Sequence, residues 1–66
     1  MSWEEVDNAY QLKCPEGSAK ISTSFASRMN ILIVRDKEGK AIDGCSSTDP
    51  LELLQSRAER TLRKYN

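Results

Sequence analysis

The sequence predicts an α+β domain in which a C-terminal amphipathic helix packs on one face of a small antiparallel sheet of three to four strands. Two patterns carry this prediction: a capped apolar repeat of helical period over the last third of the chain, and two apolar stretches joined by a short glycine-containing turn before it. A short N-terminal helix is an option that the first residues leave open. Residues 1–66 are expected to form a single domain.

The first fourteen residues carry two competing patterns. Ser2 to Glu5 resembles a helix capping box, and Trp3, Val6 and Tyr10 follow at helical spacing. Residues 10–14 instead alternate between apolar and polar side chains, as a strand does. We expect a helical turn or two followed by a short strand.

The middle of the chain predicts three strands. Residues 15–17 (Pro-Glu-Gly) form a turn signal, and a strand is expected from about residue 20 to residue 26. Residues 30–36 and 41–45 then flank a short turn in which Gly39 supplies a left-handed backbone position. These two stretches are predicted to form a hairpin.

The first strand of this hairpin is apolar on both faces. Alternation places Leu32 and Val34 on one face and Ile31 and Ile33 on the other. One helix covers only one face of a sheet, and a chain of 66 residues buries only roughly 60% of the surface that its unfolded form exposes. We therefore expect self-association, as a homodimer, through Ile31 and Ile33, unless the N-terminal segment closes that face.

The C-terminal helix has a well-marked start. Asp49 is the expected N-cap, Pro50 the first helical residue, and Glu52 the capping-box acid. The residues expected to face the core share one stripe at about 100° per residue. They are Leu51, Leu54, Ala58, Leu62 and Tyr65, with Thr61 at the edge.

A second strip on this helix is unusual because one apolar residue lies among cations. It consists of Leu53, Arg57, Arg60 and Lys64. Interfaces combine arginine with apolar anchors and place lysine at the rim. We interpret this strip as the partner-binding surface of the helix.

The stretch from Ile31 to Leu62, a strand, a glycine turn, a strand and a helix, resembles the second half of the double-stranded RNA-binding domain. The resemblance implies a helix before the three strands, and phosphate contacts from a lysine cluster at the start of the last helix. Here that place is taken by residues 49–52 (Asp-Pro-Leu-Glu), whose acids repel phosphate.

The sequence contains no enzyme signature. There is no histidine, which excludes cysteine–histidine and serine–histidine nucleophiles. Cys14 and Cys45 lack neighbours at zinc-ligand spacing, so no metal is expected, and both are interpreted as buried free thiols. The isolated glycines match no phosphate-binding or dinucleotide-binding motif, and no cofactor is expected.

These observations predict a small non-enzymatic protein-binding module, a regulator or inhibitor of a larger protein, of which a viral or mobile-element antagonist of a host system is one instance. The alternatives are local nucleic-acid binding by the basic strip and a small-ligand or nucleotide pocket between subunits. Ten acidic and ten basic residues cancel, which disfavours broad attraction to nucleic acid or membrane. With no leader and no long apolar run, a soluble, cytoplasmic protein is expected.

Overall fold

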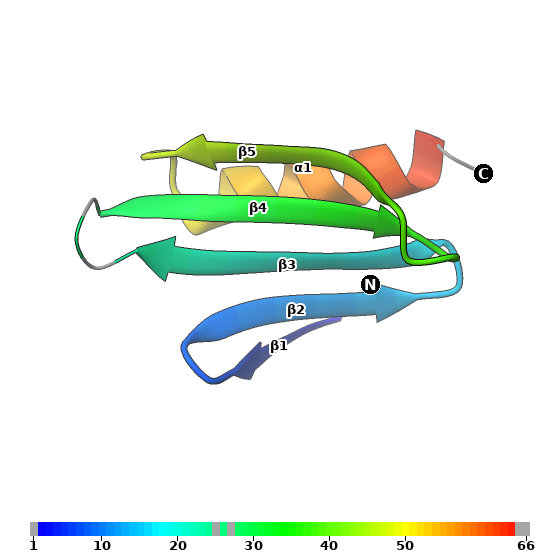
Figure 1. The fold of residues 1–66 in the computed structure, drawn as a ribbon, viewed down its shortest axis with the longest axis horizontal. Helices are drawn as coiled ribbons and strands as arrows, with labels where there is room; N and C mark the ends of the chain where they lie inside the picture. The colour runs from blue at the N-terminus through cyan, green and yellow to red at the C-terminus, as the bar shows by residue number, and fades with distance from the viewer. Residues whose placement is uncertain (1, 25, 27, 65–66) are drawn as a thin grey trace.

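The protein is an antiparallel sheet with one helix packed on one of its faces. This computed structural model describes residues 2–24, 26 and 28–64. In chain order the elements are β1 (Trp3–Val6), β2 (Ala9–Cys14), β3 (Gly17–Ser24), β4 (Met29–Asp36), β5 (Ala41–Ser47) and α1 (Leu51–Lys64). The five strands form one sheet in the order β1-β2-β3-β4-β5, each antiparallel to the next (Figure 1). The α+β class is confirmed, but the sheet has more strands than the three to four expected.

The additional strand comes from the N-terminus, where the expected helical turn is wrong. β1 and β2 form a hairpin whose two-residue turn, Asp7 and Asn8, has positive φ angles of 49° and 63°. Two successive positive φ angles define the turn type that matches the twist of paired strands, and aspartate and asparagine tolerate it well. A hairpin at this position also differs from the RNA-binding domain, whose first element is a helix.

Gly17, at the end of the turn between β2 and β3, lies very close to β4. β3 begins at Gly17, earlier than the expected residue 20, and Gly17 has a φ of 151°. A Cβ atom at this position would lie 2.2 Å from the backbone oxygen of Arg35. Glycine is therefore required here by the close approach of the two strands as well as by the backbone angle.

The predicted hairpin of β4 and β5 is confirmed. Gly39 has a φ of 89°, and the Asp36 carboxylate closes the turn by accepting hydrogen bonds from the backbone N–H groups of Glu38 (2.9 Å) and Lys40 (3.0 Å). A register shift follows Val34, so β5 bends where its pairing with β4 begins.

The core lies between α1 and the sheet. α1 packs against β3 and β4 and lies behind the sheet in Figure 1. Leu32 and Val34 are fully buried beneath it, whereas Ile31 and Ile33 are each 37% exposed on the opposite face. The prediction that one helix covers one face is confirmed, and within the described residues no element covers the other. We call that other side the open face.

The helix buries the predicted stripe. Leu54, Ala58 and Leu62 are buried and Leu51 packs partly against them; Tyr65 lies outside the described residues. The indole nitrogen Nε1 of Trp3 donates a 2.9 Å hydrogen bond to Glu59, which ties the helix to the first strand. Among the described residues, α1 is the only helix, and it is too short and too polar to cross a membrane.

Candidate functional site

A groove runs between the edge strand β5 and the helix α1. Because β5 is last in the strand order, its outer backbone edge pairs with no other strand in the described part of the chain. Two hollows follow this edge, one of about 440 Å³ and one of about 450 Å³. The first is lined by Cys45, Ser46, Ser47, Asp49, Leu53, Leu54, Arg57 and Arg60, and the second by Ile42, Asp43, Thr61 and Lys64. We call the two together the β5–α1 groove.

An ion pair crosses the middle of this groove. The Arg57 guanidinium donates two hydrogen bonds to the Asp43 carboxylate, from Nε at 3.0 Å and from Nη2 at 2.9 Å. The Thr61 hydroxyl adds a third, longer bond at 3.3 Å. The hydrogen bond from Arg57 lowers the pKa of Asp43 from its ordinary value, because it stabilises the carboxylate. The pair therefore ties α1 to β5, with Arg57 lining one hollow and Asp43 lining the other.

The structure brings all four residues of the predicted strip to this groove, but they differ in their exposure and in their ion pairing. Leu53 is 57% exposed, the largest value among the exposed large hydrophobic residues described. Arg60 and Lys64 are exposed, and no ion pair with either is found in the described residues. Arg57 is engaged by Asp43 and contributes to packing as well as to the surface. The groove thus offers one apolar side chain and two available cations.

Sequence reasoning missed the strand side of this site. Asp43, Ser46 and Ser47 line the groove from β5, yet nothing in a single sequence shows which residues of the following helix lie beside them. β5 continues to Ser47, beyond the predicted end at Cys45. That extension brings the unpaired edge alongside Leu53.

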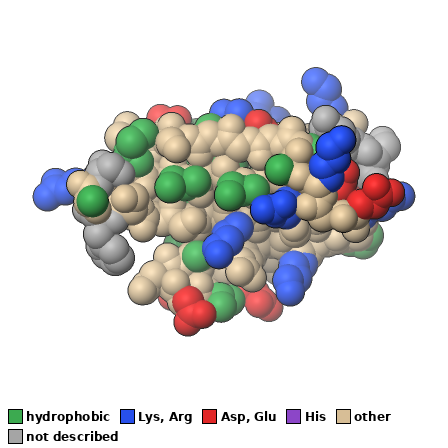
Figure 2. All heavy atoms as spheres, in the orientation of Figure 1, with side chains coloured by type: hydrophobic (Ala, Val, Ile, Leu, Met, Phe, Trp, Pro, Cys, Tyr) green, Lys and Arg blue, Asp and Glu red, His purple; other side chains and the backbone are tan. Residues whose placement is uncertain are grey.

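The two residues predicted for self-association lie elsewhere, on the open face. Ile31 and Ile33 occupy the middle of the sheet, on β4 between β3 and β5. Figure 2 views this side of the molecule and shows apolar side chains near its centre with lysine and arginine side chains among them. Val6, 39% exposed, is a further exposed aliphatic residue on this face.

The cysteines are free thiols, partly and not fully buried, and both pack against the core. Burial raises the pKa of the Cys14 thiol, which keeps it protonated and poorly nucleophilic at neutral pH. In the described residues, no group of three histidine, cysteine, aspartate or glutamate side chains is placed to hold a metal ion.

Comparison of the chain with protein-family models, with curated proteins and with solved structures finds no match.

Proposed function

We propose that this protein is a small non-enzymatic protein-binding module, a regulator or inhibitor of a larger protein, and that its partner binds along the β5–α1 groove. The observation that carries the proposal is the position of Leu53. This leucine is 57% exposed and lies beside a strand edge that pairs with no other strand in the described part of the chain. An apolar anchor next to free hydrogen-bonding backbone is what an extended peptide segment recognises.

The expected mode of binding is the addition of a strand to β5. Backbone hydrogen bonds to an exposed sheet edge supply affinity, and alternate side chains of the added strand supply specificity. One such side chain meets Leu53 and should be apolar. Another approaches Arg60 or Lys64 and should be acidic. The partner segment is therefore extended, with apolar and acidic residues on the side that faces the groove.

The two edges of the sheet are not equally suited to this role. β1 is only four residues long and carries the exposed carboxylates of Glu4 and Glu5. Short length and charge are the usual protection of an edge against pairing. In β5 the single charged residue, Asp43, is already paired with Arg57, and the stretch from Gly44 to Ser47 is uncharged. The edge at β5 is thus the better template for a partner strand.

The test compares binding of the native partner by four variants. The protein is used to isolate its partner from the native cell or its host, and affinity is then measured by calorimetry. Leu53→Asp and Arg60→Glu should each weaken binding by more than about 1 kcal/mol, the usual threshold for an interface residue that matters. Lys37→Glu, a charge reversal in the exposed β4–β5 turn, is the matched control and should leave the affinity unchanged. Full binding by a Leu53→Asp/Arg60→Glu double variant would refute the proposal.

Nucleic-acid binding by Arg57, Arg60 and Lys64 is the alternative, and it has less support. Asp43 already neutralises Arg57, and Asp49 lines the same hollow, so carboxylates lie where phosphates would have to bind. A steep fall in affinity with rising salt would favour this alternative.

A small-ligand or nucleotide pocket between subunits is a further alternative. It requires a dimer, which the sequence predicts to form through Ile31 and Ile33. No observation on the described residues favours a particular small ligand.

A further inference from the structure

The charges of the sheet are sorted between its two faces. All basic residues of the strands, Lys13, Lys20 and Arg35, lie on the open face, one each on β2, β3 and β4. The acidic residues Glu5, Asp36 and Asp43 lie on the face toward α1, and only Glu4, in the edge strand β1, shares the open face. The chain as a whole has no net charge. The open face is therefore locally positive in a neutral protein.

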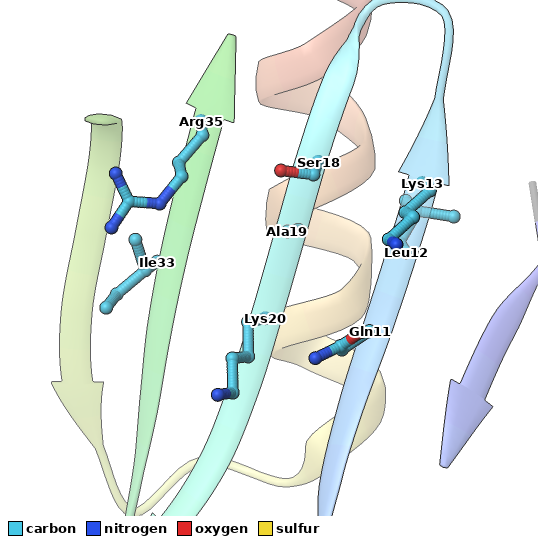
Figure 3. A pocket seen from close by; sticks show the side chains of 8 residues that line it. All are labelled: Gln11, Leu12, Lys13, Ser18, Ala19, Lys20, Ile33 and Arg35. Atoms are coloured by element: carbon cyan, nitrogen blue, oxygen red, sulfur yellow. The ribbon is translucent and has the colours of Figure 1, made fainter. Parts of the chain in front are cut away.

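These cations surround one hollow. Strand pairing aligns Lys13, Ser18 and Arg35 in one row across the sheet, and Gln11, Lys20 and Ile33 in the next. Adjacent strands lie about 4.8 Å apart, so the backbones at Lys13 and Arg35 are separated by roughly 10 Å, with only a small serine between them. The resulting hollow has a volume of about 300 Å³ (Figure 3). We call it the basic hollow.

The basic hollow has cations available to a ligand. No carboxylate lines it, and within the described residues neither Lys13 nor Lys20 forms an ion pair. The Arg35 guanidinium is oriented by a 3.0 Å hydrogen bond from Nη1 to the backbone oxygen of Gly39, which leaves its other N–H groups free to donate. Glu4 lines a neighbouring hollow together with Lys13 and Gln11.

We propose that the basic hollow receives an acidic segment of a partner protein, whose carboxylates contact Lys13, Lys20 and Arg35 while its aliphatic side chains cover Ile31 and Ile33. This surface is separate from the β5–α1 groove, and the proposal stands or falls independently of it. Its basis is complementarity: cations without internal partners lie beside two isoleucines that are each 37% exposed. A segment carrying both acidic and aliphatic residues satisfies both features.

Other occupants of this face fit less well. Single-stranded nucleic acid binds on aromatic stacking platforms, but Trp3 and Tyr10 pack toward the core on the other side of the sheet. Ring stacking therefore has no support on the described part of the open face. A second copy placed face to face would bring the lysines and arginines of both chains together, and like charges across an interface are costly.

The experiment measures the binding of a fluorescein-labelled peptide that alternates glutamate and valine, by fluorescence polarisation at low salt. Lys13→Glu/Lys20→Glu should weaken binding by more than about tenfold, since it replaces attraction by like-charge repulsion. Lys37→Glu/Lys40→Glu changes the net charge equally in the exposed β4–β5 turn and is the matched control. It should lower affinity by less than about threefold, as expected of a general charge effect. All of these proteins are measured in the Leu53→Asp background, because the β5–α1 groove is itself expected to bind segments that carry acidic and apolar residues.

Three results would overturn this inference. Equal losses in the two double variants would show that the peptide responds only to overall charge. A labelled single-stranded oligonucleotide that binds more tightly than the peptide and is equally sensitive to Lys13→Glu/Lys20→Glu would show that the face is a nucleic-acid surface. The absence of saturable peptide binding in the Leu53→Asp background would show that the basic hollow is not the site. Amide chemical-shift changes confined to β2, β3 and β4 would support the inference directly.

Discussion

Leu53 and Leu54 are adjacent in sequence, and the structure predicts opposite effects when each is shortened. Leu54 is 2% exposed and belongs to the core cluster, whereas Leu53 is 57% exposed in the β5–α1 groove. Leu54→Ala removes buried apolar surface and leaves a cavity, which costs about 2–5 kcal/mol of unfolding free energy. Leu53→Ala changes a mostly hydrated side chain, and such changes usually stay within roughly 0.5 kcal/mol.

These free energies translate into distinct melting temperatures. In a domain of this size, 1 kcal/mol shifts Tm by about 4–8 °C. Leu54→Ala should therefore lower Tm by at least about 8 °C, and Leu53→Ala by less than about 4 °C. Thermal unfolding followed by circular dichroism measures both. Leu53→Asp should be similarly mild, because an acidic residue near a helix N-terminus interacts favourably with the helix dipole.

Partner binding should show the reverse order. Leu53→Ala should weaken it by more than about 1 kcal/mol, while Leu54→Ala should lower it only as far as the folded fraction falls. A similar loss of Tm in the two alanine variants would refute this reasoning, because it would mean that Leu53 is buried against its own sheet. Full partner affinity in a folded Leu53→Ala variant would refute it equally.

Three further predictions concern the rest of the molecule. The pKa of Asp43 is lowered in the folded state, so its pair with Arg57 should stabilise the fold fully above about pH 4, the pKa of an unfolded aspartate, and lose this effect on further acidification. Asp43→Asn should therefore show a weaker fall of Tm in acid than the unchanged protein. The same dependence of Tm on pH in the two proteins would contradict the pairing. Gly17→Ala should unfold or severely destabilise the protein, since its Cβ would lie 2.2 Å from the Arg35 oxygen; a normal Tm would contradict the close approach of β3 and β4. If copies associate through the open face, salt should screen its cations and strengthen the dimer, and sedimentation equilibrium at several salt concentrations measures this. A 7.5 kDa monomer at every salt concentration would contradict the self-association through Ile31 and Ile33 that the sequence predicts.

The helix and the β4–β5 hairpin were predictable because their signals are local. The apolar stripe through Leu54, Ala58 and Leu62, and the glycine turn at Gly39, each lie within one short window of sequence. In the first hairpin the strand at residues 10–14 was predicted, but the segment before it was wrongly expected to be helical although a turn signal was present at Asp7 and Asn8. The helical spacing of the nearby apolar residues favoured a helix more strongly, because two residues that tolerate positive φ indicate a hairpin only when the segments on either side of them are known to pair.

The candidate sites depend on long-range geometry that a single sequence does not contain. The strip on α1 was predictable from helical spacing, but its contact with β5 depends on how the helix crosses the sheet. That crossing is what engages Arg57 with Asp43 and leaves Arg60 available. The basic hollow needs the register of three strands: Lys13 and Arg35 share a row only because β2, β3 and β4 pair as they do.

Amide hydrogen exchange along β5, with and without the bound partner, tests whether the partner adds a strand to this edge. The outer backbone N–H groups between Gly44 and Ser47 have no strand partner in the described part of the free protein, so their exchange should be fast. Addition of a partner strand predicts that alternate amides in this stretch become strongly protected, with Leu53→Asp abolishing the protection. Unchanged exchange rates in β5 at a partner concentration that saturates binding would contradict the addition of a partner strand to this edge.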